Sequence, residues 1–147
     1  MNKFLFLGFI SFLLFSCECL QDVKQTKKGK AISYEIIEKG EHSGVKVRKN
    51  FVISSKEDFH NFLRKYQISK NNIKVNFDKK MLIGIFLGEQ TTGGFAINVQ
   101  KIIENDNKVI IYYNVKNNQI ATMVITTPYL LIQITKTNKP IDFQLIN

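Results

Sequence analysis

Short runs in which apolar and polar residues alternate make up most of the chain after residue 30, as is typical of β-strands. The first run, residues 31–38, places Ile32, Tyr34 and Ile36 at every second position, and a second run follows at 45–53. Because the residues between them, 39–44, are rich in turn formers, the two runs are predicted to form a hairpin. Later runs rich in Ile, Val, Phe or Tyr predict further strands at 73–77, 81–87, 95–103, 108–115, 123–126, 129–135 and 141–146.

One segment has the period of a helix instead. Its apolar residues follow the spacing i, i+3, i+4 and i+7: Phe59, Phe62, Leu63 and Tyr66. Ser55 and Asp58 have the spacing of a capping box, with Asp in place of Glu or Gln. The pattern predicts a helix over 56–66 whose aromatic face packs on a sheet.

The order of these elements predicts the fold class. Two strands, a helix and then a series of strands, without α/β alternation or internal repeats, indicate an α+β fold. We expect a mainly antiparallel β-sheet, sandwich- or barrel-like, with one amphipathic helix. Residues 105–107 are predicted to be a tight hairpin loop, and the glycine-rich residues 88–94 to be a hairpin loop in which Gly93 or Gly94 has a positive φ.

The N-terminus has the pattern of an export signal. Lys3 precedes an apolar run at 4–15, which is shorter than the roughly 20 residues that span a bilayer and fits a signal peptide. Leu14-Phe15-Ser16-Cys17 then resembles the lipobox of bacterial lipoproteins. The resemblance implies that residues 1–16 are removed and that Cys17 carries lipid at a membrane of the cell envelope. An ordinary secretory signal that is cleaved further on is the alternative.

Beyond Cys17, the polar, lysine-rich stretch 17–30 is predicted to be a flexible tether, and 31–147 to be a single β-rich domain. Cys19 is the only other cysteine, and its role is left open. The oligomeric state is also open.

The net charge of +9 raises the question of a polyanionic partner. Only Arg48 and Arg64 among the 21 basic residues are arginines, and the lysines are scattered along the chain. Because specific recognition of phosphates and bases relies on bidentate arginine, we do not expect a nucleic-acid partner. A basic surface that binds other polyanions at the envelope is kept as an alternative.

Residues suited to catalysis or metal binding are few. His42 and His60 are the only histidines, and neither stands in a recognisable metal-ligand spacing. Asp78, which follows Phe77, is interpreted as a turn or capping residue. No nucleophile has an adjacent base, so we predict no catalytic residue, no metal and no cofactor, and a protein that is not an enzyme.

Four segments together resemble the PrcB C-terminal domain family: 75–78, 81–88, Thr92-Gly93-Gly94-Phe95-Ala96-Ile97, and 127–134 beginning with Thr127-Pro128-Tyr129. The resemblance covers about 73–136. It implies a non-catalytic lipoprotein subunit that binds or stabilises a protease. Where the family usually has Tyr after the two glycines, this chain has Phe95.

Two segments of this pattern are the candidate protein-binding residues: Thr91, Thr92, Gly93, Gly94 and Phe95, and Thr127, Pro128 and Tyr129. Binding residues concentrate on loops carried by a rigid sheet, which favours the first segment. Thr91-Thr92-Gly93 also resembles a loop of the chagasin-like inhibitors of cysteine peptidases. However, no Asn-Pro precedes it and the chain has no tryptophan for that family's second motif. A peptidase inhibitor therefore remains the alternative.

Overall fold

The computed structural model describes residues 29–68, 73–118 and 124–147. The predicted signal peptide, the lipid on Cys17, the tether up to residue 28 and Met123 lie outside these residues. The described chain forms two four-stranded sheets and one helix: β1 (Lys30–Ala31), β2 (Tyr34–Gly40), β3 (Val47–Ile53), α1 (Lys56–Lys65), β4 (Lys80–Gly88), β5 (Phe95–Glu104), β6 (Val109–Asn117), β7 (Tyr129–Thr135) and β8 (Ile141–Leu145).

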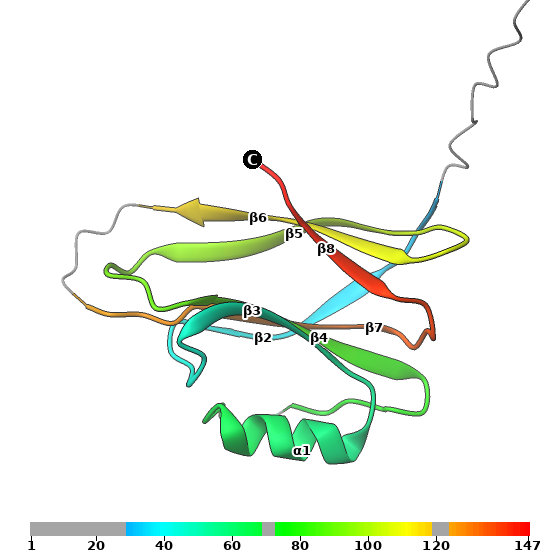
Figure 1. Cartoon of the computed structure of the whole chain (residues 1–147), viewed down its shortest axis with the longest axis horizontal. Helices are drawn as coiled ribbons and strands as arrows, with labels where there is room; N and C mark the ends of the chain where they lie inside the picture. Colours follow the sequence, from blue (N-terminus) through cyan, green and yellow to red (C-terminus); the bar gives the residue numbers. More distant parts are fainter. Residues whose placement is uncertain (1–28, 69–72, 119–123) are drawn as a thin grey trace, which may run out of the picture.

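The two sheets pack face to face, with α1 on the outer side of one of them (Figure 1). Sheet A has the order β1-β5-β6-β8, and sheet B has the order β2-β7-β4-β3. All neighbours are antiparallel except β6 and β8, which are parallel. The predicted mainly antiparallel fold with one helix is thus confirmed, in the form of a sandwich.

The continuous apolar sequence of β4 follows from its position between two cores. Ile83 and Ile85 face the core between the sheets. Leu82 and Phe86 face the second core, which lies between sheet B and α1. A strand covered on both faces needs apolar residues at every position rather than at every second one.

The predicted helix is confirmed with its cap. The Ser55 Oγ accepts a hydrogen bond from the Asp58 backbone N–H at 3.1 Å, and Tyr66 is the C-cap. Phe59, Phe62 and Leu63 are buried against sheet B. The aromatic stripe read from the sequence is therefore the face that closes the second core.

The predicted hairpin between 31–38 and 45–53 is wrong. The first run splits into β1 in sheet A and β2 in sheet B, because the chain passes from one sheet to the other at residues 32–33. β2 then pairs with β7 and β3 with β4, at opposite edges of sheet B. Alternation of side chains shows which residues are buried, but it does not specify the partner strand.

Two further predicted strands are absent. Ile73, Val75 and Phe77 pack partly buried against the helix-side core without joining a sheet, which explains their alternation. The Asn76 Oδ1 accepts from the Asp78 backbone N–H at 3.1 Å, so Asp78 is a turn residue as interpreted. Of the described part of 123–126, only Thr126 pairs, in an isolated bridge to Gln90.

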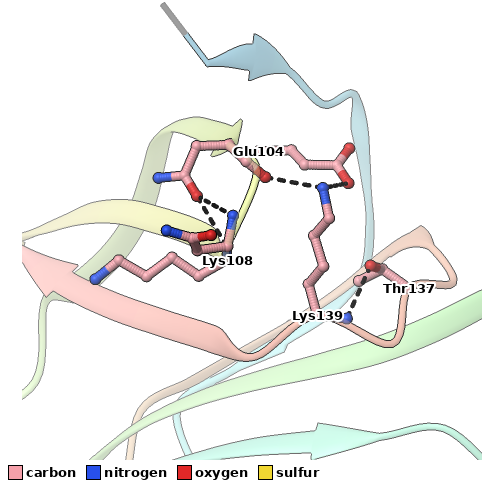
Figure 2. Close-up of polar contacts among 6 residues, drawn as sticks. Glu104, Lys108, Thr137 and Lys139 are labelled. Atoms are coloured by element: carbon pink, nitrogen blue, oxygen red, sulfur yellow. Dashed lines mark hydrogen bonds and ion pairs between the residues drawn. The ribbon is translucent and has the colours of Figure 1, made fainter. Parts of the chain in front are cut away.

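The predicted loop at 105–107 is confirmed. The Asn105 Oδ1 accepts hydrogen bonds from the backbone N–H groups of Asn107 at 3.0 Å and Lys108 at 2.8 Å. The Lys139 ammonium lies 2.8 Å from the Glu104 carboxylate and donates to the Asn105 carbonyl at 2.8 Å (Figure 2). These contacts hold the turn between β7 and β8 against the β5–β6 hairpin.

Candidate functional site

The glycine-rich segment 88–94 crosses from one sheet to the other. β4 ends in sheet B at Gly88 and β5 begins in sheet A at Phe95, so the predicted hairpin loop is wrong. The predicted positive φ is confirmed at Gly94, where φ is 86°, and Gly88 also has a positive φ of 75°. A Cβ at Gly88 would lie 2.7 Å from the Arg48 backbone nitrogen, so a side chain is excluded there by both space and conformation.

The two candidate segments lie side by side. Gln90 and Thr126 exchange backbone hydrogen bonds of 2.8 and 2.9 Å. The Thr126 hydroxyl donates to the Thr92 carbonyl at 2.9 Å. The structure thus brings the chain around residues 91–95 next to 127–129, a proximity that the sequence could not establish.

Thr127 is buried and holds the connection between β2 and β3. Its hydroxyl accepts from the Ser43 backbone N–H at 2.6 Å and donates to the Ser43 carbonyl at 2.8 Å. Its own backbone N–H donates to the Glu41 carbonyl at 2.7 Å. The Thr127 hydroxyl is therefore bonded within the domain. Thr127 contributes to the candidate site by positioning the neighbouring loop around Ser43.

Tyr129 is also internal, with 6% of its surface exposed. Its ring stacks on Phe86 with 5.4 Å between the ring centroids, and its hydroxyl donates to the Glu38 carboxylate at 2.9 Å. Burial, together with the hydrogen bond to Glu38, raises the pKa of Tyr129 above its ordinary value. The phenol is therefore a neutral structural donor within the second core.

Only part of the two candidate segments is accessible. Thr91 is exposed, Thr92 and Phe95 are partly exposed, and Gly93 is buried. Phe95, Gly94, Pro128 and Tyr129 line a cleft of about 360 Å³ that opens at this end of the sandwich.

Other residues of this cleft were not predicted from the sequence. Lys39 and Glu41 come from the end of β2, Asn98 from β5, and Asn118 from the end of β6. No local motif marks them, because they meet only through the pairing of β2 with β7 and the stacking of the sheets.

Exposed apolar side chains surround the same loops. Val47 is 76% exposed and Ile125 is 66% exposed. They flank the segment 88–90, which bonds through Glu89 N–H to the Lys46 carbonyl on one side and through Gln90 to Thr126 on the other. We call this part of the molecule, residues 39–47, 88–95 and 124–128, the loop end.

The first described residues lie at the opposite end of the sandwich (Figure 1). β5 starts in the loop end at Phe95 and finishes at Glu104, which pairs with Lys30 of β1. A strand of this length covers about 30 Å at about 3.3 Å per residue. We call this opposite part, residues 30–33, 77–80, 104–108 and 135–139, the entry end.

Within the described residues, no group of three or more His, Cys, Asp or Glu side chains gathers as a metal site would require. His42 is exposed in the loop end and His60 is exposed on α1. No helix in the described ranges is long and apolar enough to cross a membrane.

Comparison with known proteins gives one family. The model of the family described as PrcB C-terminal matches residues 81–135. An uncharacterized protein of Methanocaldococcus jannaschii is 38% identical over 61 residues, which are 41% of this chain and 38% of that protein. The chain thus spans well under half the length of that curated relative. No solved structure matches the chain.

The family match begins at β4 and ends with β7, so it contains both candidate segments but leaves out the segment 73–80 that the resemblance had included. Residues 81–135 of this chain are thus similar to the PrcB C-terminal family.

Proposed function

We propose that this protein is a lipoprotein of the cell envelope, anchored through Cys17, whose sandwich is a non-catalytic protein-binding module. Its partner in this proposal is a protease that it holds or stabilises. The family match supports the protease as the partner class, because the PrcB resemblance implies such a subunit.

The separation of the two ends is the observation that carries the proposal. The chain enters the sandwich at β1, and the loop end lies at the other end of β5. Residues 18–28 between Cys17 and the domain would span at most about 40 Å when extended. A lipid on Cys17 would therefore be attached at the entry end, and the loop end is the part of the sandwich farthest from that attachment, where a partner can reach it.

The chemistry of the loop end suits a protein partner. Val47 and Ile125 offer apolar surface, and Thr91, Lys46 and Glu89 provide polar groups around it. Interfaces combine an apolar centre with a polar rim. The backbone bridge between Gln90 and Thr126 fixes the loops in advance, which reduces the entropy lost on binding.

Affinity capture tests the proposal. The lipidated full chain serves as bait in detergent-solubilised envelopes, beside the variants Ile125→Arg in the loop end and Leu145→Arg on β8. Leu145 is a matched control because it is also an exposed apolar residue, at 49%. We expect a protease to be captured by the wild type and by Leu145→Arg but not by Ile125→Arg.

Either of two results would refute the proposal: no protease bound to any bait, or equal capture by both variants. The activity of the captured protease separates the two roles. A subunit or stabiliser leaves the protease active, whereas the alternative of a chagasin-like inhibitor requires that the Thr91–Gly93 loop blocks its cleft. Capture of polyanions alone, released by salt, would favour the basic-surface alternative.

A further inference from the structure

A groove of about 620 Å³ lies between the first turns of α1 and the segment 73–77. Its floor is aromatic and aliphatic, with Phe59, Phe77 and Val75 among the lining residues. Three lysines stand around it: Lys56, Lys74 and Lys80. No carboxylate is among the described residues that line it.

The groove belongs to the entry end. Lys80 pairs with Thr135 at the end of β7, and residues 135–137 share a cavity of about 240 Å³ with residues 30–33. The Lys136 ammonium donates to the Phe77 carbonyl at 2.8 Å and to the Ser54 carbonyl at 3.1 Å. Lys136 therefore fixes one wall of the groove beside the point where the chain enters the sandwich.

Other lysines of this end are already paired. Lys108 lies 2.7 Å from the Asp142 carboxylate. Lys139 lies 2.8 Å from the Glu104 carboxylate, as Figure 2 shows. In the described parts of the chain, no ion pair joins Lys56, Lys74 or Lys80 to a carboxylate. Nearby, the Glu35 carboxylate accepts a hydrogen bond of 2.6 Å from Gln133, and Asp78 is exposed in the turn after Phe77.

We propose that this groove docks on a membrane surface that contains anionic phospholipid. Lys56, Lys74 and Lys80 would contact the headgroup phosphates, and the apolar floor would face the boundary between headgroups and acyl chains. Charge complementarity favours this occupant, since basic side chains around an apolar patch are the usual features of a membrane-surface site. The position favours it as well, because residues 18–28 are all that separate the groove's end of the domain from Cys17.

The docking proposal rests on the proposed function only in assuming a lipid on Cys17. It adds that the domain has a fixed orientation relative to the membrane. One lipid attachment through a chain of this length allows the domain to tumble above the membrane. A second contact at the entry end would hold the loop end outward. An acylated site together with a basic patch is one of the combinations that anchor a protein stably to a membrane.

Lysine footprinting of the lipidated full chain in vesicles tests the docking. Acetylation rates are measured by mass spectrometry in phosphatidylcholine vesicles and in vesicles that also contain phosphatidylglycerol. We expect Lys56, Lys74 and Lys80 to react about fivefold more slowly on the anionic vesicles. The exposed lysines Lys46, Lys49 and Lys116, nearer the loop end, should change less than about twofold.

Equal protection of the two lysine sets, or no protection of the groove set, would overturn the docking. Protection by polyglutamate on neutral vesicles, without protection by anionic lipid, would also overturn it and would indicate an acidic protein segment as the occupant. The mass of the Cys17 peptide in the same digest reports the anchor separately, so the anchor and the groove can fail independently.

A pair of charge-matched variants completes the test. The full chain with Cys17→Ser is partitioned between water and each kind of vesicle, and the ratio of the two partition coefficients is compared between variants, so that the contribution of residues 1–16, which all variants share, cancels. Changing all three groove lysines to Gln should lower this ratio by about 100-fold, at about fivefold per lysine. Changing Lys46, Lys49 and Lys116 to Gln should leave it within about twofold, and an equal fall in both variants would refute a specific site. Melting curves establish that each variant is folded.

Discussion

Tyr129→Phe removes one hydroxyl from the residue that the family pattern places after Pro128. The hydroxyl donates to the Glu38 Oε1 at 2.9 Å, and the Glu38 Oε2 is buried without a hydrogen-bond partner in the described structure. The variant would therefore remove the one side-chain donor that the structure shows at this carboxylate. The stacking on Phe86 and the burial of the ring should remain, since Phe has the same shape.

The expected cost follows from these contacts. Hydrogen bonds to charged groups contribute about 1.5–3 kcal/mol, but Glu38 is only partly buried and can regain some hydration. We therefore expect a loss of about 1–2 kcal/mol in the free energy of unfolding. At about 4 °C per kcal/mol for a domain of this size, Tm should fall by about 4–8 °C.

The pH dependence of the same pair has a defined sign. Burial and Glu38 raise the pKa of Tyr129 in the folded state above the value of about 10 in the unfolded chain. The resulting stability is fully present below about pH 10 and is lost as the pH rises through the folded-state pKa. Because Phe does not titrate, the Tyr129→Phe variant should not show this loss of stability at alkaline pH.

Urea unfolding followed by circular dichroism measures the effect, with Tyr112→Phe on the open face of sheet A as the control. A double-mutant cycle with Glu38→Gln isolates the pair. A loss below about 0.5 kcal/mol for Tyr129→Phe, or a loss equal to that of Tyr112→Phe, would show that the Tyr129–Glu38 bond does not stabilise the domain. Loss of partner capture by a Tyr129→Phe variant of unchanged stability would instead make Tyr129 a binding residue.

Three further predictions concern single contacts. Thr127→Val should cost about 1–3 kcal/mol in urea unfolding, because the backbone groups of Ser43 lose their partner; a cost near zero would show that water replaces the hydroxyl. Gly88→Ala should cost more than the roughly 1–2 kcal/mol of a positive φ alone, because its Cβ would also lie 2.7 Å from the Arg48 backbone nitrogen; a smaller cost in thermal melts would contradict this. The hydrogen bond from Lys108 lowers the pKa of Asp142, so Lys108→Met should return it to the ordinary range in an NMR titration, and an unchanged pKa would refute that cause.

The fold was predictable where a segment carries its own signal. The spacing of Phe59, Phe62 and Leu63 and the cap at Ser55 are local, so the helix was found within one residue. The pairings were not local. The run 31–38 reads as one strand because Ile32, Tyr34 and Ile36 alternate, yet its two halves serve different sheets.

The candidate site was predictable only in part, for a related reason. The glycines were identified because a positive φ at Gly94 is a property of one residue. Thr127 and Tyr129 were predicted as binding residues because they stand in the family pattern, but their side chains are bonded inside the domain. Lys39 and Asn118 reach the cleft through strand pairing, which no sequence motif records.

The central claim is that the loop end, and not the entry end, meets a protein partner. Site-specific photo-crosslinking in intact cells tests it most directly, with the photoreactive residue placed at Thr91 in one variant and at Lys79 in the other; both positions are exposed. We predict a covalent adduct with an envelope protease from position 91 and no protein adduct from position 79. Protein adducts from position 79 alone, or from neither position, would contradict the account.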